Sequence, residues 1–159
     1  MLFNDDRWMT ATHFEKIGAR RIFPCWDKPE YKTTFNISVK HHNNYSVISN
    51  MPVQKTEEEE DMLWTYFSTT PPMSTYLVAL VVVERLKLFN FVDTFAPINI
   101  WCKQDSRLNM YYAGNIISNL TMYMKNKWDK GYLNWKVDHI AFPIVDDEDM
   151  KSFGLVIYR

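Results

Sequence analysis

The pattern of apolar and polar positions predicts strands along most of the chain. In residues 33–40, Phe35, Ile37 and Val39 alternate with polar residues, and this period of two indicates a half-buried strand. Residues 76–83 form a continuous apolar run rich in β-branched side chains, which predicts a strand buried on both faces. Similar runs predict further strands at residues 45–49, 62–68, 85–92, 98–103, 137–145 and 153–158.

A helical period replaces the strand pattern after residue 105. Asp105 or Ser106 can cap the start of a helix, and Gly131 can end it. Apolar residues then recur at helical spacing: Leu108, Tyr112, Ile116, Leu120 and Met124. We expect this stripe to face a core. The fold class is therefore mixed, with a β-rich part to about Val92 and an α+β part after it.

Two polar segments are expected to be turns. The sequence His-His-Asn-Asn at residues 41–44 predicts a hairpin between the strands on either side of it. Adjacent His41 and His42 would point to opposite faces of an extended chain, so a shared metal ion is not expected. Five acidic residues at positions 57–61 repel one another and predict a solvated hairpin loop; a calcium loop would need a glycine at its turn.

Composition excludes several classes of protein. The chain of 159 residues is 47% hydrophobic and 16% aromatic, so it can build a core, and its net charge of −1 gives no basic field for nucleic acid. The longest apolar run is too short to span a bilayer, and no signal peptide is evident at the start. These features leave the compartment of the protein undetermined.

Cysteines and glycosylation acceptors add little to this picture. One disulfide between Cys25 and Cys102 is possible, but a pair this sparse favours two free thiols. Asn36, Asn44 and Asn119 each begin an Asn-x-Ser/Thr acceptor, which would matter only in a secreted protein.

The densest chemistry lies in residues 12–39. Carboxylates at Glu15 and Asp27 flank the pair Arg20-Arg21, and arginines so close can keep a buried acid ionised. Spacing alone favours a structural ion-pair clamp on a loop. The alternative is that one carboxylate faces a cationic group of a ligand.

These residues also carry a family resemblance. Thr-His-Phe-Glu at 12–15, Gly-Ala-Arg-Arg at 18–21, Phe-Pro-Cys-Trp-Asp-Lys-Pro at 23–29 and Lys32 resemble the pattern TQFE…ARRxFPCFDEPxxK of the M1 (gluzincin) zinc aminopeptidases of the aminopeptidase N type. Ser-Asn-Met-Pro at 49–52, the segment 70–77 and Phe-Gly-Leu through Tyr-Arg at 153–159 resemble later blocks of the same family. The resemblance extends from about Phe3 to Arg159.

The resemblance implies two parts of a larger architecture. Residues 1–92 would be the saddle-like N-terminal β domain, lacking its first strands. Residues 93–159 would be the beginning of the thermolysin-like catalytic domain, ending before the zinc-binding helix. That helix carries His-Glu-x-x-His and the general base in the family. None of His13, His41, His42 and His139 is followed by Glu, so we expect no zinc ligand or catalytic residue within this chain.

The resemblance also implies part of a substrate site. Glu15 matches the family's glutamate that contacts the peptide amine, and His13 takes the place of a glutamine that lines the first side-chain pocket. In the exopeptidase motif Met150 is kept, but Glu148 replaces a glycine and Lys151 replaces the amine-binding glutamate. Unit charges about 4 Å apart interact by about 4 kcal/mol at an effective dielectric constant near 20, so this reversal predicts a large loss of kcat/KM.

These features predict a degenerate aminopeptidase that is inactive as it stands. The alternative is a non-catalytic binding module or decoy subunit that recognises a peptide N-terminus or pairs with an intact paralogue. A fold unrelated to M1 peptidases is disfavoured, because several spaced motifs agree with the family.

Overall fold

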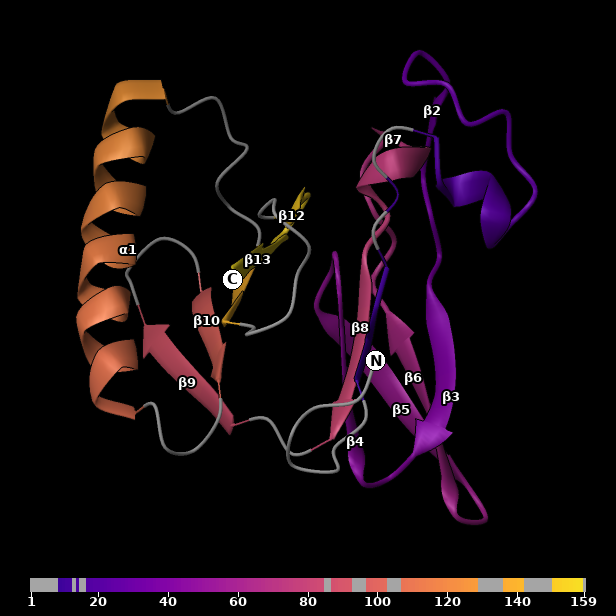
Figure 1. The fold of residues 1–159 in the computed structure, drawn as a ribbon, viewed down its shortest axis with the longest axis horizontal. Coiled ribbons are helices and arrows are strands. Elements are labelled where there is room, and N and C mark those ends of the chain that lie inside the picture. The colour runs from indigo at the N-terminus through magenta and orange to yellow at the C-terminus, as the bar shows by residue number, and fades with distance from the viewer. Residues whose placement is uncertain are drawn as a thin grey trace. The chain divides into compact units, whose positions relative to one another are not determined.

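The computed structural model describes residues 9–12, 14, 17–84, 87–92, 97–102, 107–128, 136–141 and 150–158. The chain divides into two compact units. The first contains Met1–Arg85 and Lys151–Phe153, and the second contains Leu86–Met150 and Gly154–Arg159. Strands predominate in the described residues, and one long helix lies between the tenth and eleventh strands, which confirms the mixed, β-rich fold class (Figure 1). The predicted domain boundary near residue 92 stays a prediction.

The first unit consists of small antiparallel sheets. One has the order β1-β8-β4, formed by Met9–Ala11, Leu80–Glu84 and Tyr45–Ser49. Another has the order β3-β6-β5, formed by Ser38–His42, Met62–Phe67 and Val53–Glu59. β2 (Lys32–Thr33) pairs with β7 (Met73–Ser74), and short 3-10 helices lie at Ala19–Arg21 and Thr75–Leu77. Buried side chains of Ile48, Phe67, Val81 and Val83 contribute to its core.

The second unit is a sheet with one helix. The sheet has the order β12-β13-β11-β10-β9. Strands β9 (Lys87–Val92), β10 (Pro97–Cys102), β11 (Val137–Ala141) and β13 (Leu155–Tyr158) belong to this unit, whereas Lys151 and Ser152 of β12 (Met150–Ser152) belong to the first. β10, β11 and β13 run parallel, and β9 is antiparallel to β10. Helix α1 (Arg107–Trp128) contacts β10 and β9.

The single strand predicted at residues 33–40 is divided into β2 and β3, with residues 34–37 outside both; the faces alternate as expected, but the pairing does not. Phe35, Ile37 and Val39 are half-buried and alternate with exposed residues, which confirms the period. The predicted hairpin is wrong, because β3 and β4 belong to different sheets. β3 finds its antiparallel partner in β6 and β4 finds its partner in β8, so the turn between them carries the chain from one sheet to the next.

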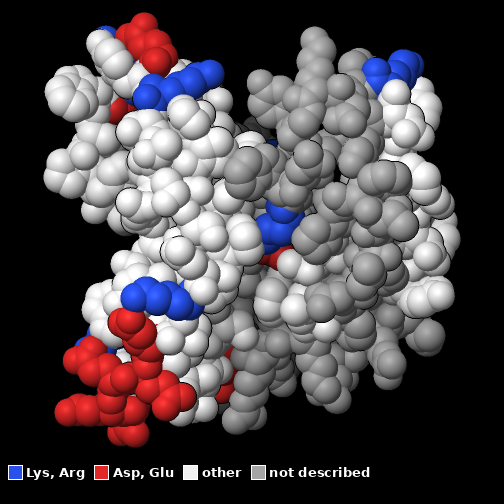
Figure 2. Space-filling view, turned by 180° about the vertical axis from the view of Figure 1, so that it is seen from behind, with Lys and Arg blue, Asp and Glu red and all other residues white. Residues whose placement is uncertain are grey.

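The acidic segment is also more regular than predicted. Glu57, Glu58 and Glu59 lie in strand β5, and the turn is confined to Glu60 and Asp61. Every side chain of β5 is exposed, so water screens the repulsion. Lysines also pair with two of the acids: Lys55 Nζ lies 2.6 Å from Glu57 Oε1, and Lys40 Nζ lies 2.8 Å from Glu59 Oε2. Figure 2 shows acidic side chains gathered at one corner of the molecular face.

Helix α1 packs through a different face from the predicted one. Tyr112, Ile116, Leu120 and Met124 are all exposed, and the side chain of Leu108 lies outside the description. The packed face is formed by residues at the same spacing: Met110, Ala113, Gly114, Ile117, Ser118 and Thr121. Small residues let this face approach the sheet closely, which the bulky stripe would not allow. None of the described helices is both long and apolar enough to cross a bilayer.

Strand β8 begins later than predicted. A 3-10 helix occupies Thr75–Leu77, so the strand covers Leu80–Glu84. Its side chains alternate between buried and half-buried instead of being buried throughout. The apolar run at residues 76–83 therefore includes the end of a 3-10 helix and most of strand β8. An apolar run alone does not distinguish a helix from a strand.

Candidate functional site

A buried carboxylate organises the loop between the first 3-10 helix and β2. Asp27 is 2% exposed and has a left-handed backbone conformation, with φ of 52°. The backbone N–H of Arg20 donates to Asp27 Oδ2 over 3.2 Å, and Arg20 Nε donates to the same oxygen over 3.3 Å. Arg20 Nη2 also donates to the Trp26 carbonyl over 3.4 Å. The 3-10 helix thus places both donors of Arg20 around one carboxylate oxygen.

The second oxygen of Asp27 is occupied as well. Thr75 Oγ1 donates to Asp27 Oδ1 over 3.0 Å, which ties the loop to a residue 48 positions away. Burial by itself would raise the pKa of Asp27, but the hydrogen bonds from the Arg20 backbone, the Thr75 hydroxyl and the Arg20 side chain outweigh it and lower the pKa. Asp27 is therefore ionised at neutral pH, and its oxygens serve protein groups. For this residue, the structural clamp is the correct interpretation.

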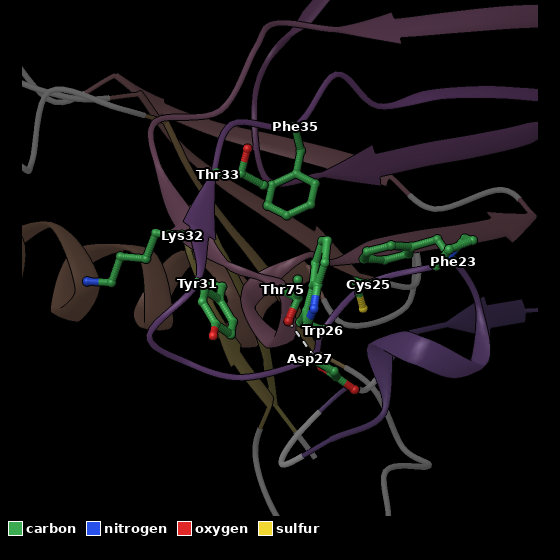
Figure 3. A pocket seen from close by; sticks show the side chains of 10 residues that line it. Phe23, Cys25, Trp26, Asp27, Tyr31, Lys32, Thr33, Phe35 and Thr75 are labelled. Atoms are coloured by element: carbon green, nitrogen blue, oxygen red, sulfur yellow. Dashed lines mark hydrogen bonds between the residues drawn. The ribbon is translucent and has the colours of Figure 1, made fainter.

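An aromatic cavity of about 600 Å³ lies beside this clamp. Figure 3 shows the aromatic side chains of Phe23, Trp26, Tyr31 and Phe35 around it, while the ammonium of Lys32 points away from them. Phe23 and Phe35 meet edge to face, with ring centroids 6.1 Å apart. Trp26 is 79% exposed and Tyr31 is 52% exposed. The motifs did not predict this cavity, although four aromatic residues within thirteen positions were the available signal.

The predicted amine-binding residues are only partly described. Lys151 is exposed and lies in β12. Met150 is the first residue of that strand, and its side chain is not among those described. His13, Glu15 and Glu148 lie outside the described residues. The grouping of these five side chains into an amine-binding site stays a prediction.

A buried amide connects three segments of the first unit. Asn50 is 0% exposed and directly follows β4. Its Nδ2 donates to the carbonyls of Leu77 and Phe153, each over 2.7 Å, and its Oδ1 accepts from the Ala79 backbone over 2.8 Å. The Ser-Asn-Met-Pro block was recognised as a family motif but not as a junction, because the partners are 27 to 103 positions away.

The second unit contains a buried ion pair between Lys136 and Asp138. Asp138 Oδ1 also accepts from Asn99 Nδ2 over 2.7 Å and from Trp101 Nε1 over 3.0 Å. Burial lowers the pKa of Lys136, and the nearby Asp138 carboxylate opposes that shift. These contacts join β10 to β11 and are structural.

The side chains of His41 and His139 are engaged within the protein. His41 is buried, with Nδ1 against the His42 carbonyl at 2.9 Å and Nε2 against Thr65 Oγ1 at 2.8 Å. His139 Nδ1 lies 2.9 Å from the Tyr158 hydroxyl, and burial lowers its pKa despite the Asp138 carboxylate. Across the described parts of the chain, no three His, Cys, Asp or Glu side chains are grouped to hold a metal ion. The described residues therefore do not fit the zinc site of the family.

The cysteines and glycosylation acceptors have clear surroundings. Cys25 and Cys102 are free thiols, as expected. Burial raises the pKa of the Cys102 thiol. Asn36, Asn44 and Asn119 are exposed, which makes them accessible, although their use stays a prediction.

Known proteins resemble this chain over nearly all of its length. Residues 2–77 match the Peptidase M1 N-terminal domain. The chain is 37% identical to aminopeptidase Q of Mus musculus, over 99% of this chain and 30% of that protein. It is 35% identical to glutamyl aminopeptidase of Bos taurus and 37% identical to aminopeptidase Q of Homo sapiens, in both cases over 16% of the relative. It thus spans less than a third of these relatives. Motifs, fold and these similarities agree that the chain belongs to the M1 aminopeptidase family and carries its N-terminal domain.

Proposed function

We propose that this chain is a peptide-binding member of the M1 family that has little or no aminopeptidase activity. The observation that supports it is Lys151, an exposed cation in β12 at the position of the family's amine-binding glutamate. The relatives are named as aminopeptidases, whose substrates begin with an α-ammonium group. A lysine at this point repels that group, whereas a carboxylate attracts it.

The exposure of Lys151 sets the size of the effect. Unit charges about 4 Å apart interact by about 1 kcal/mol in water, and an exposed side chain lies near that limit. Replacing an attraction of this size by an equal repulsion changes the interaction free energy by about 2 kcal/mol, which is roughly 30-fold in affinity. This is smaller than the loss expected for a buried site, but it is measurable.

The test compares two peptides and three proteins. A fluorescein-labelled peptide with a free N-terminus and its N-acetylated form are titrated with the wild type, Lys151→Glu and Lys127→Glu, and binding is followed by fluorescence anisotropy. We expect the affinity for the free-amine peptide, divided by that for the acetylated peptide, to be roughly 30-fold higher in Lys151→Glu than in the wild type. Lys127→Glu makes the same change in net charge at an exposed position of α1. It should leave the ratio of the two affinities unchanged.

Three results would contradict the proposal. The first is a wild-type protein that binds neither peptide. The second is a wild-type protein that already prefers the free amine as strongly as Lys151→Glu does. The third is release of N-terminal residues by the wild type that a metal chelator abolishes.

A second candidate function is a binding module that uses the aromatic cavity. The cavity beside Asp27 favours it, because its rim contains the highly exposed Trp26 and the charge of Asp27 is compensated by Arg20. An uncharged aromatic side chain of a partner is the ligand that suits these walls.

Cys25 provides a built-in reporter for this second candidate, since its half-buried thiol lines the cavity. We expect N-acetylphenylalaninamide to slow alkylation of Cys25 by iodoacetamide, as measured by peptide mass spectrometry. N-acetylserinamide, its polar counterpart, should give no protection. Trp26→Ala should remove the protection, and equal labelling rates with both compounds would exclude the cavity as an aromatic site.

A further inference from the structure

We infer that Asn50 is a positioning residue that holds the segment Lys151–Phe153 within the first unit. Asn50 and Phe153 are 103 positions apart in sequence, yet Asn50 Nδ2 donates to the Phe153 carbonyl over 2.7 Å. The importance of this tether for ligand binding rests on the proposed role of Lys151, which lies two residues before Phe153. The tether itself does not depend on that role.

The chemistry of the amide suits a three-way junction. A primary amide has two N–H donors, and Asn50 directs Nδ2 at the carbonyls of Leu77 and Phe153. Its oxygen accepts from the Ala79 N–H over 2.8 Å. Asn50 is fully buried, so replacing its amide would remove all three of these hydrogen bonds from the interior of the first unit.

The surroundings of Asn50 hold it in place. The neighbouring Ser49 Oγ donates to the Ala79 carbonyl over 2.8 Å, so two consecutive side chains bind the segment before β8. Met51, on the other side, is also buried. The position of the Asn50 amide is therefore set by its neighbours in sequence and by the segment before β8, and not by Lys151–Phe153.

The partner segment differs from its neighbours in the chain in the unit to which it belongs. Lys151–Phe153 belong to the first unit, although the residues on both sides of the segment belong to the second. Gly154 has φ of 72°, a left-handed conformation that turns the chain immediately after Phe153 and favours glycine. The Asn50 bond thus fixes the Phe153 carbonyl at the end of this segment, two residues after Lys151.

Hydrogen exchange tests the tether directly. Amide exchange of residues 150–154 is measured by mass spectrometry in the wild type, Asn50→Ser, Asn50→Asp and Ser49→Ala. Asn50→Asp keeps the shape but places carboxylate oxygens against two carbonyls. We expect exchange in this segment to be at least about tenfold faster in both Asn50 variants. Ser49→Ala removes an adjacent buried hydrogen bond and should leave that exchange unchanged.

The wild-type protein supplies a second measurement in case the Asn50 variants do not fold. In NMR spectra, both side-chain amide protons of Asn50 should be protected from exchange with solvent. Rapidly exchanging protons on Asn50, or unchanged exchange of residues 150–154 in folded Asn50 variants, would overturn the inference. Faster exchange together with an unaltered peptide-affinity ratio would support the tether and count against the proposed role of Lys151.

Discussion

Replacing Asp138 with alanine is expected to lower the free energy of unfolding by about 3–5 kcal/mol, because it breaks a buried ion pair from one side. Lys136 would keep a buried ammonium without its carboxylate. The side chains of Asn99 and Trp101 would also lose their common acceptor. Urea denaturation at pH 7, followed by circular dichroism, measures the loss.

The pH dependence separates charge burial from lost packing. Burial already lowers the pKa of Lys136 from its ordinary value of 10.5, and Asp138 opposes that shift. In Asp138→Ala the opposition is gone, so the folded pKa falls further below the unfolded value. The cost of the buried charge is then fully present at low pH and is relieved as pH rises through the folded pKa toward 10.5.

We therefore expect Asp138→Ala to gain stability relative to the wild type as pH rises from 7 toward 10. The double variant Lys136→Met/Asp138→Asn should recover most of the loss at pH 7, since it removes both charges, keeps both side-chain volumes and leaves an acceptor oxygen for Asn99 and Trp101. An Asp138→Ala protein that unfolds at the same urea concentration as the wild type would show that the pair is not buried.

Ile100→Ala should be the second large effect, with a loss of about 2–5 kcal/mol in the free energy of unfolding. Ile100 is 2% exposed in β10, and its truncation leaves a cavity in the second unit. Ile116→Ala is the matched control, because Ile116 is 41% exposed on α1. We expect the control to cost less than about 1 kcal/mol in the same denaturation experiment.

The comparison also decides which face of α1 is packed. If Ile116→Ala were as costly as Ile100→Ala, then the aromatic and methionine stripe would be part of a core, as the sequence pattern predicted. A small effect would support the observed packing through Ala113, Gly114 and Ile117.

Pairing with an intact paralogue stays a proposal for this chain. The exposed apolar face of α1, with Tyr112, Ile116 and Leu120, is a surface that such a partner would cover. Co-purification of the chain with an intact family member, and its loss in Ile116→Asp, would support this proposal.

The sequence by itself determined the family, the fold class and several local features. Spaced motifs from Thr12 to Arg159 were sufficient for the family, because many residues must agree in order. The half-buried face of Phe35, Ile37 and Val39 followed from their period of two, which is a local property of an extended chain. The ionised state of Asp27 was also accessible, since its arginine partner lies only seven residues away.

Only the tertiary structure decided which elements meet. β3 pairs with β6 and not with the adjacent β4, because strand pairing depends on contacts across the whole unit and not on proximity in sequence. The more apolar face of α1 is bulky and the other face is largely small, so the choice depended on which face fits the sheet and not on apolar character alone. The junction at Asn50 was beyond prediction for the same reason, since its bond to Phe153 joins groups that the local pattern does not connect.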